Sequence, residues 1–356
     1  DKGISKVLIT TDSNIIDARL HDPLVRSLEK KGIQYKIFDG VQENPSESVV
    51  EAATKALKEN SCEAVLGLGG GSSIDTAKLS ALSAKNPGSL LKYEGADMYE
   101  KLPETVIAIP TTAGTGSEVS QSAIITDQLN KRKISIRGKD IAPKIAILDP
   151  ELLMTVPLRL AASTGMDAFA HAIEAFQSTA ATPLSDLCAI KALDLISQNI
   201  RPFVYNRENK QAAKAMSMGA MLAGIAFANG RVGLPHAMSL PLTARYNIPH
   251  GTACAVLLAK CVKHSWKANP RRFAIIAKVI GEKVHSLSLT ERAQKAANAI
   301  QQLCHDLDIP ENFKEWNIPS SAVIQMSKDV LSSKIHETNC MKVGYEEIAF
   351  IYSELI

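Results

Sequence analysis

Short apolar runs alternate with helix-period segments in the first 150 residues of the chain. The runs have the length of buried strands and fall at residues 7–10, 35–38, 64–68, 106–109 and 145–148. Apolar residues recur with helical spacing over residues 46–59 and 73–84. Strands that alternate with helices are typical of a parallel sheet with crossover helices. The pattern therefore predicts an α/β fold for this part of the chain.

The pattern changes at the segment AILDPELLMTVP. Runs typical of strands become scarce after it, and helix-period segments with intervening prolines continue to the C-terminus. We place a boundary between Pro150 and Pro157 and predict an α/β domain over residues 1–153 and an all-α domain over residues 154–356. The most apolar long stretch, residues 212–228, contains Lys214 and is too short and mild to span a bilayer, so we interpret it as a buried helix.

A glycine-rich turn lies between the run at 64–68 and the helix that follows it. The turn consists of Gly69, Gly70, Gly71 and Ser72. Asp75 lies in the first turn of the following helix. A strand, a glycine turn and a helix can present backbone N–H groups and a helix N-terminus to a phosphate. The usual dinucleotide fingerprint is matched except at its last position, Ser72. We interpret the turn as a candidate diphosphate site, and a tight turn without a ligand is the alternative.

A second polar loop, TTAGTGSE, follows the run VIAIP. Its hydroxyl groups belong to Thr111, Thr112, Thr115 and Ser117. These hydroxyls and the glycines between them could contact the same phosphates. The alternative is a polar turn in which Ser117 caps a helix.

One carboxylate and three imidazoles form the candidate metal site. Asp167 and His171 lie four residues apart in MDAFAHAIEA, so on a helix they project from one face, and their apolar flanks make an unpaired carboxylate costly to bury. His236 and His250 each follow a proline. This ligand set suits a borderline divalent metal such as Fe²⁺ or Zn²⁺ and leaves positions for a substrate oxygen. The alternatives are a helix-surface pair and histidines satisfied in the core or in a loop.

Taken together, the motifs resemble those of the iron-containing, or group III, alcohol dehydrogenase family. GGGSSIDTAK, IPTTAGTGSEVS, AILDP, TGMDAFAHAIEA and NIPHG occur in the family's order and approximate spacing, and the similarity weakens after about Lys263. The resemblance implies a dehydroquinate synthase-like fold: an N-terminal α/β dinucleotide-binding domain with a parallel sheet, and an all-α C-terminal metal-binding domain. It also implies that the metal and the nicotinamide meet in the cleft between the domains.

The resemblance assigns roles to individual residues. The implied metal ligands are Asp167, His171, His236 and His250. The implied cofactor contacts are Asp12, Asn44, Gly69, Gly70, Gly71, Ser72, Asp75, Thr111, Thr112, Thr115, Ser117 and Lys133. Asp12 ends the strand KVLITTD and matches the acid that binds the adenosine ribose, where a carboxylate repels the 2′-phosphate of NADP and so favours NAD. The alternative for Asp12 is the N-cap of the next helix.

Three positions depart from the family pattern. Leu240 stands where many members have a histidine that is thought to relay protons, so a water chain or the ribose hydroxyls would have to replace it. Arg231 and Arg245 stand near the metal loop, where guanidinium groups could bind an aldehyde with a carboxylate, sulfonate or phosphonate at its far end. The alternative for both arginines is a loop-anchoring ion pair or a solvated surface position.

Composition agrees with a cytoplasmic enzyme. The chain has 356 residues, 46% of them hydrophobic, which suits two domains. Forty basic and 37 acidic residues give a net charge of +3 without a basic stripe, so we expect no nucleic-acid partner, and we expect no membrane partner. The cysteines show no CxxC motif, which indicates reduced thiols in the cytoplasm. We expect a homodimer or higher homo-oligomer, and an N-terminal segment normal for the family that is missing before Asp1.

The predicted activity is a metal-dependent, NAD(H)-linked alcohol dehydrogenase or aldehyde reductase that acts on a small alcohol or aldehyde. Fe²⁺ is preferred over Zn²⁺ on the resemblance alone. One alternative is a dehydroquinate-synthase-like, NAD- and metal-dependent cyclase or a polyol dehydrogenase. Another is a sensor that binds nucleotide or metal without turnover. Net NADH production with simple alcohols separates the predicted enzyme from the cyclase and the sensor.

Overall fold

The computed structural model describes residues 3–356, which divide into two compact units. The first unit runs to Thr112 and resumes from Ser117 to Leu153. The second unit contains Met154–Ile356 and the short segment Ala113–Gly116. Residues 1–2, at which the expected N-terminal segment would join, lie outside the described residues.

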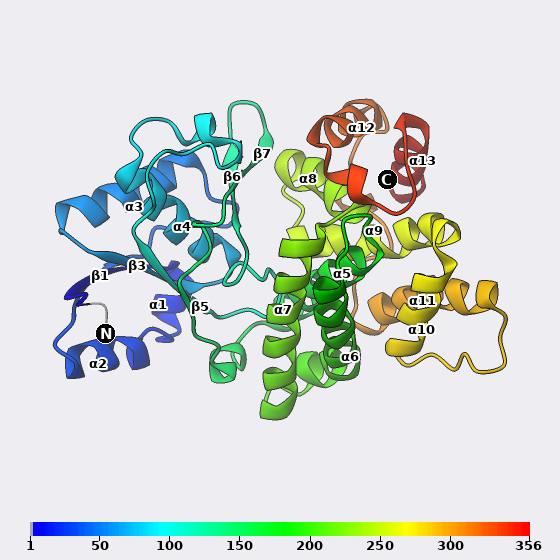
Figure 1. Ribbon diagram of the computed structural model, residues 1–356, viewed down its shortest axis with the longest axis horizontal. Helices are drawn as coiled ribbons and strands as arrows, with labels where there is room; N and C mark the ends of the chain where they lie inside the picture. Colours follow the sequence, from blue (N-terminus) through cyan, green and yellow to red (C-terminus); the bar gives the residue numbers. More distant parts are fainter. Residues whose placement is uncertain (1–2) are drawn as a thin grey trace. The chain divides into compact units, whose positions relative to one another are not determined.

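A five-stranded parallel sheet forms the centre of the first unit (Figure 1). Its strands are β1 (Lys6–Thr10), β2 (Gln34–Phe38), β3 (Ala64–Gly69), β5 (Thr105–Pro110) and β8 (Ile145–Ala146). Their order is β2-β1-β3-β5-β8. β3 is buried at every residue, as expected for the central strand of a parallel sheet covered on both faces. The predicted parallel α/β architecture is confirmed.

Helices cover both faces of this sheet because alternate strand residues point to opposite sides. On one face, Ile9 and Leu66 pack in a core with Leu28. On the other face, Leu8 packs with Leu57. The helices of the first unit are α1 (Ser13–Asp17), α2 (Asp22–Lys30), α3 (Glu47–Glu59), α4 (Gly71–Lys85) and the 3-10 helices η1 (Leu90–Tyr93) and η2 (Pro150–Leu153).

A second, three-stranded sheet adds structure that the sequence pattern did not predict. Its strands are β4 (Gly95–Ala96), β6 (Ser122–Asp127) and β7 (Arg132–Arg137), in the order β4-β7-β6. β6 and β7 pair antiparallel, and alternate residues of β6 are buried. Ile125, Ile134 and Ile136 form a core with Leu79 and Leu82 of α4. Only one face of each strand is therefore buried, so buried and less buried residues alternate along β6 and β7. The sequence prediction relied on continuous apolar runs and did not detect these strands.

The second unit is helical, and the structure assigns no strand within the described residues 154–356, which confirms the predicted all-α architecture. Its α-helices are α5 (Leu158–Gln177), α6 (Pro183–Tyr205), α7 (Lys210–Gly230), α8 (Leu234–Tyr246), α9 (His250–Ser265), α10 (Pro270–Val279), α11 (Leu289–Asp306), α12 (Ala322–Ser333) and α13 (Tyr345–Leu355). Its 3-10 helices are η3 (Trp266–Ala268), η4 (Lys314–Trp316) and η5 (Ile335–Thr338).

α5 forms the centre of this unit. It is buried at almost every residue from Ala161 to Gln177 and packs against α6, α7 and α9 (Figure 1). A helix that is apolar on all sides belongs in a core, so each polar residue on α5 needs a specific partner. Across the described residues, no helix has the length and apolar character needed to cross a membrane.

Candidate metal and cofactor sites

Four side chains with metal-binding atoms converge in the second unit. Asp167 comes from α5, His236 from α8, and His250 and Cys254 from α9. One carboxylate oxygen, two ring nitrogens and one sulfur all lie within 4.8 Å of one another. His236 Nε2 and His250 Nε2 lie 3.3 Å and 3.8 Å from Asp167 Oδ1. Cys254 Sγ lies 3.7 Å from His250 Nε2.

The start of α9 reaches this group because α9 approaches the backbone of α5 closely. A Cβ atom on Gly251 would stand 2.3 Å from the carbonyl oxygen of Ser163, which excludes any larger residue there. Ser163 precedes Asp167 by one helical turn. α9 begins at His250, so its first residue is placed next to the carboxylate of α5. α8 begins two residues before His236, with Pro235 in its first turn.

Three buried atoms of this region lack a hydrogen-bond partner within the described part of the chain. They are Asp167 Oδ1, His171 Nδ1 and His236 Nε2. Burial of such atoms without a partner is costly, and native proteins avoid it. A tetrahedral ion bound at about 2.0–2.2 Å would separate its oxygen and nitrogen ligands by about 3.3–3.6 Å. The separation of 3.3 Å between Asp167 Oδ1 and His236 Nε2 agrees with this value, and the separation of 3.8 Å between Asp167 Oδ1 and His250 Nε2 is slightly longer. These atoms therefore fit a divalent metal.

His171 lies beside this group and not within it. Its ring stacks between Phe227 and His236, with centroid distances of 4.3 Å to each. His171 Nδ1 lies 4.0 Å from Asp167 Oδ2, and the ring also has a hydrogen bond with the backbone of Gly114. The role of His171 as a ligand stays a prediction. Sequence reasoning did not include Cys254, although it follows His250 by four residues and so shares a face of α9.

Glu174 sets the orientation of the His236 ring. Its carboxylate is fully buried and accepts hydrogen bonds from His236 Nδ1 at 2.6 Å and from the backbone N–H groups of Gly233 at 2.7 Å and His236 at 3.3 Å. A proton on Nδ1 leaves the lone pair of Nε2 for a metal. Sequence reasoning missed Glu174. The available signal was its spacing of seven residues from Asp167, which places both acids on one face of a buried helix.

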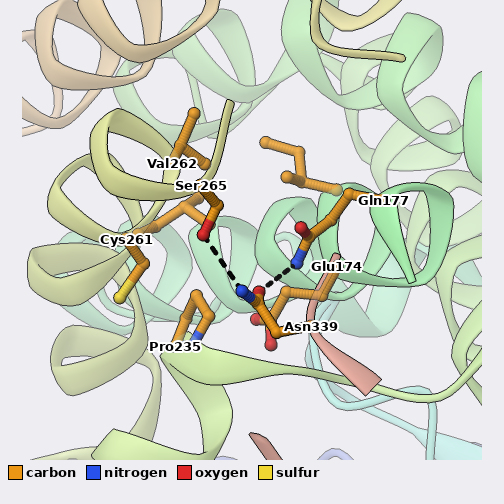
Figure 2. A pocket seen from close by; sticks show the side chains of 9 residues that line it. Glu174, Gln177, Pro235, Cys261, Val262, Ser265 and Asn339 are labelled. Atoms are coloured by element: carbon orange, nitrogen blue, oxygen red, sulfur yellow. Dashed lines mark hydrogen bonds between the residues drawn. The ribbon is translucent and has the colours of Figure 1, made fainter. Parts of the chain in front are cut away.

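Behind Glu174, a chain of amide hydrogen bonds fixes the neighbouring side chains. Gln177 Nε2 donates to Asn339 Oδ1 at 2.7 Å, and Asn339 Nδ2 donates to Ser265 Oγ at 3.0 Å. Figure 2 shows Asn339 between these two partners, at a small pocket that is also lined by Glu174 and Cys261. These bonds hold Gln177, Asn339 and Ser265 together at the same pocket as the carboxylate of Glu174.

Burial and neighbouring charges determine the protonation of this group. Burial alone would raise the pKa of Asp167. The neighbouring imidazoles have a larger, opposite effect, to which His171 contributes most, and they hold the pKa of Asp167 well below its usual range. Burial lowers the pKa of His171 to about 3, so its ring is neutral at pH 7 and keeps a lone pair. Burial also opposes protonation of His236, but Cys254 and Glu174 outweigh it and raise this pKa. Metal binding would therefore displace a proton from His236.

The candidate cofactor loops lie at the carboxyl ends of neighbouring strands in the first unit. Gly69 at the end of β3 pairs with Pro110 at the end of β5, and the N–H of Thr111 donates to the carbonyl of Gly69 at 3.0 Å. Asp12 follows β1, on the other side of β3. The strand order reverses direction between β1 and β3, and ligands of open α/β sheets bind outside the strand ends at such a point.

The turn between β3 and α4 forms an open cradle. Gly69 has a φ of +147°, and a Cβ atom there would stand 2.4 Å from Ser73 Oγ. Gly70 faces Thr112, whose Oγ1 would lie 3.6 Å from an added Cβ. No side chain of the described residues caps α4, so the backbone N–H groups of Gly71 and Ser72 at its start remain for an anion. The turn fits a pyrophosphate.

Asp12 is an N-cap and also lies next to the candidate cofactor site, so the two interpretations considered for it are compatible. Its Oδ1 accepts hydrogen bonds from the backbone N–H groups of Asn14 at 3.1 Å and Ile15 at 3.3 Å, so it is the N-cap of α1. Its Oδ2 lies 3.5 Å from the position of an added Cβ on Gly69, next to the glycine turn. One oxygen holds the helix, and the other faces the candidate cofactor site.

Asp75 and Ser117 are already engaged with a buried lysine. Ser117 Oγ donates to Asp75 Oδ1, and the backbone N–H of Ile124 donates to Asp75 Oδ2 at 2.9 Å. Lys78 Nζ is fully buried and donates to Ser117 Oγ at 2.8 Å and to the carbonyl of Ser122 at 2.8 Å. These contacts connect α4 to β6. They give both predicted cofactor residues a structural function.

Lys133 and Asn44 contact each other. Lys133 Nζ donates to Asn44 Oδ1 at 2.6 Å and to Thr126 Oγ1 at 2.9 Å. Burial lowers the pKa of Lys133 to about 8, although Glu43 and Asp75 oppose the shift. The remaining predicted cofactor residue, Thr115, belongs to the segment that is part of the second unit.

The two arginines differ in their surroundings. Arg245 forms an ion pair, which was one of the alternatives considered for it. The Nε and Nη2 atoms of Arg245 lie 2.8 Å and 2.7 Å from Asp329 Oδ2. Arg231 is exposed at the end of α7, with a φ of +68°. Leu240, in place of the expected histidine, is half-buried on α8.

Comparison with known proteins covers both units. Residues 1–150 match iron-containing alcohol dehydrogenase, and residues 161–356 match the C-terminal part of the Fe-containing alcohol dehydrogenase family. The chain is 35% identical to NAD-dependent methanol dehydrogenase of Bacillus methanolicus, over 98% of this chain and 92% of that protein. A 1,3-propanediol oxidoreductase structure superposes with a TM-score of 0.97 at 34% identity, over 99% and 93% of the two chains. Sulfoacetaldehyde reductase from Bifidobacterium kashiwanohense, solved in complex with NAD+, superposes with a TM-score of 0.89 at 29% identity, over 99% and 91%.

Proposed function

The chain belongs to the iron-containing alcohol dehydrogenase family, and from this premise we propose that it transfers a hydride reversibly between NAD(H) and a small alcohol or aldehyde. It is an oxidoreductase. The observation that carries the proposal is the convergence of Asp167 Oδ1 and His236 Nε2, both buried and without a hydrogen-bond partner in the described chain, next to His250.

In this proposal the second unit, residues 154–356, holds one divalent metal. Asp167, His236 and His250 hold it, with His171 as the further ligand implied by the resemblance. The metal supplies a Lewis acid that polarises the substrate oxygen. Glu174 keeps His236 Nδ1 protonated, so that Nε2 presents its lone pair. The family name favours Fe²⁺, and the ligand types also accept Zn²⁺.

The first unit, residues 1–153 in the predicted division, holds the cofactor. The glycine turn and the start of α4 bind the pyrophosphate through backbone N–H groups. Asp12 Oδ2 accepts from the adenosine ribose hydroxyls and repels a 2′-phosphate, so NAD is preferred over NADP. Thr111 and Thr112 line the same site from the adjacent strand end, and Lys133 adds a positive charge.

The substrate class is a finer proposal. The relatives act on methanol, on 1,3-propanediol and on sulfoacetaldehyde, as their names state, so both neutral and anionic substrates occur among them. Arg245 already has a carboxylate partner, which leaves Arg231 as our candidate for an anionic group. Steady-state kinetics of the metal-loaded protein with NADH and a panel of neutral and anionic aldehydes would identify the preferred charge from kcat/KM.

His250→Ala tests the proposed reaction centre. We expect this variant to lose bound metal and turnover while NAD binding persists, because every proposed cofactor residue except Thr115 lies in the other unit. His305→Ala, an exposed histidine, is the control and should retain metal and activity. Full metal occupancy of His250→Ala by elemental analysis would remove His250 from the ligand set. Wild-type protein that forms no net NADH with any simple alcohol would contradict the proposed function and favour a cyclase or a sensor.

A further inference from the structure

We propose that the Cys254 sulfur is a donor to the metal, so that this site has mixed oxygen, nitrogen and sulfur ligands. The inference rests on the metal site of the proposed function and adds a ligand to it. The ligand set implied by the family resemblance contains one carboxylate and three imidazoles and no sulfur.

The position of Cys254 carries the first part of the argument. Its Sγ belongs to the group of ligand atoms that lie within 4.8 Å of one another, whereas His171 does not. The distance from Cys254 Sγ to His250 Nε2 is 3.7 Å. A tetrahedral ion with sulfur at about 2.3 Å and nitrogen at about 2.05 Å would separate these two atoms by about 3.6 Å. The observed separation therefore has the length expected for two ligands of one ion.

The backbone of α9 also places Cys254 beside the other ligand atoms. His250 and Cys254 lie one turn apart on α9, so both side chains leave the same face of the helix. The close approach of Gly251 to Ser163 holds this face against α5. Cys254 has no exposed surface, and the protein surrounds it with polar side chains from Asp167 and His236.

Two buried polar atoms beside Cys254 indicate a cation independently of the sulfur. Asp167 Oδ1 and His236 Nε2 are buried without a hydrogen-bond partner in the described chain, and both lie in the group with Cys254. A cation at their common centre would give both atoms a partner. Cys261, on the same helix and also buried, differs: its Sγ lies 4.0 Å from the sulfur of Met238 and is outside the group.

The chemical consequence concerns which metal the site selects. Formation of the metal–sulfur bond replaces the thiol proton, which leaves to solvent, and no electrons are transferred. Thiolate ligands favour zinc over hard ions such as manganese, which prefer oxygen. A sulfur donor would also occupy a coordination position that would otherwise be open to the substrate.

X-ray absorption spectroscopy of the zinc-loaded protein tests the inference without any variant. We expect a sulfur shell at about 2.3 Å in the wild type. The shell should be lost in Cys254→Ser and retained in Cys261→Ser. Zinc affinity, measured by chelator competition, should fall by about tenfold or more in Cys254→Ser, with manganese affinity less affected.

The outcomes separate this inference from the proposed function. Zinc bound with only nitrogen and oxygen neighbours in the wild type would overturn the role of Cys254 and leave the metal site intact. A sulfur shell that persists in Cys254→Ser would also overturn it. Wild-type protein that binds no divalent metal would overturn both this inference and the proposed function.

Discussion

Glu174 illustrates how one residue controls a site that it does not enter. Its carboxylate binds His236 Nδ1 at 2.6 Å and also the backbone N–H groups of Gly233 and His236. The same side chain thus determines the tautomer of His236 and the position of the start of α8. In metal sites of this kind, loss of such a carboxylate lowers metal affinity by roughly 10–100-fold.

Lys133 provides a pH-dependent prediction at the same scale. Burial lowers its pKa to about 8, so the free protein carries a positive charge on Lys133 below pH 8 and loses it above pH 8. In the proposed site this charge would attract the cofactor. NAD affinity should therefore fall as pH rises from 7 to 9, by up to about tenfold if only the charged form binds.

Titration of NAD by calorimetry across this range measures the effect. Lys133→Met should bind NAD more weakly at pH 7 and should lose the pH dependence. Lys139→Met, at an exposed lysine after β7, is the matched control and should follow the wild type. An identical pH dependence in Lys133→Met and wild type would exclude Lys133 as a cofactor contact.

At the scale of elements, the turn from β3 to α4 depends on two glycines for different reasons. Gly69 has a φ of +147° and no room for a Cβ atom next to Ser73. Gly70 has a negative φ of −73°, and the nearest atom to an added Cβ lies 3.6 Å away. The first glycine is required by the fold, whereas in the proposed cofactor site the second keeps the cradle open.

The two alanine variants should therefore differ. Gly69→Ala is expected to lower the free energy of unfolding by about 1–3 kcal/mol, the cost of a strained backbone position. Gly70→Ala should change the free energy of unfolding little and should weaken NAD binding, because its methyl group enters the cradle. Urea unfolding and NAD titration measure the two effects. Normal NAD affinity in Gly70→Ala would show that the pyrophosphate does not bind at this turn.

The antiparallel pair β6–β7 is attached to α4 by buried polar side chains. Asp75 and Lys78 of α4 bond to Ser117, Ile124 and Ser122, so polar groups in the first turns of one helix anchor the start of β6. Removal of one member of such a buried pair leaves the other charge uncompensated. Asp75 and Ser117, which the sequence offered as cofactor contacts, thereby help to hold the second sheet on α4.

For the whole molecule, the division into two units predicts that metal and cofactor stabilise different parts of the chain. A ligand that binds only the folded state stabilises it by about 2.7 kcal/mol at a concentration of 100 times its Kd. Metal should protect α5 of the second unit, and NAD should protect β3 of the first.

Hydrogen exchange with mass spectrometry resolves the two units. Removal of metal by chelation should speed exchange in peptides from α5, because Asp167 would lose its proposed cation, and should leave peptides from β3 unchanged. Addition of NAD should slow exchange around residues 64–85. Equal effects of chelation on both regions would contradict separate binding by the two units.

The sequence by itself determined what depends on local backbone geometry. The buried strands 64–68 and 106–109, the glycine turn and the change to helical periodicity near Pro150 could all be predicted, and the fold class and the family are confirmed. Apolar runs and helical spacing reflect the periods of strands and helices, which neighbouring residues set. The alternating strands β6 and β7 and the short helix α1 gave too little signal. Helix α2 was not predicted, although Leu24, Val25 and Leu28 give it an apolar face.

Only the tertiary structure decided which side chains meet. Asp167 and His236 are 69 positions apart in the chain, and their contact depends on how α8 and α9 pack on α5. The same packing brings in Cys254 and Glu174, sets His171 to one side and gives Arg245 a partner in Asp329. Contacts between distant segments depend on the close approach of whole helices, as at Gly251, and no local pattern in the sequence encodes that distance.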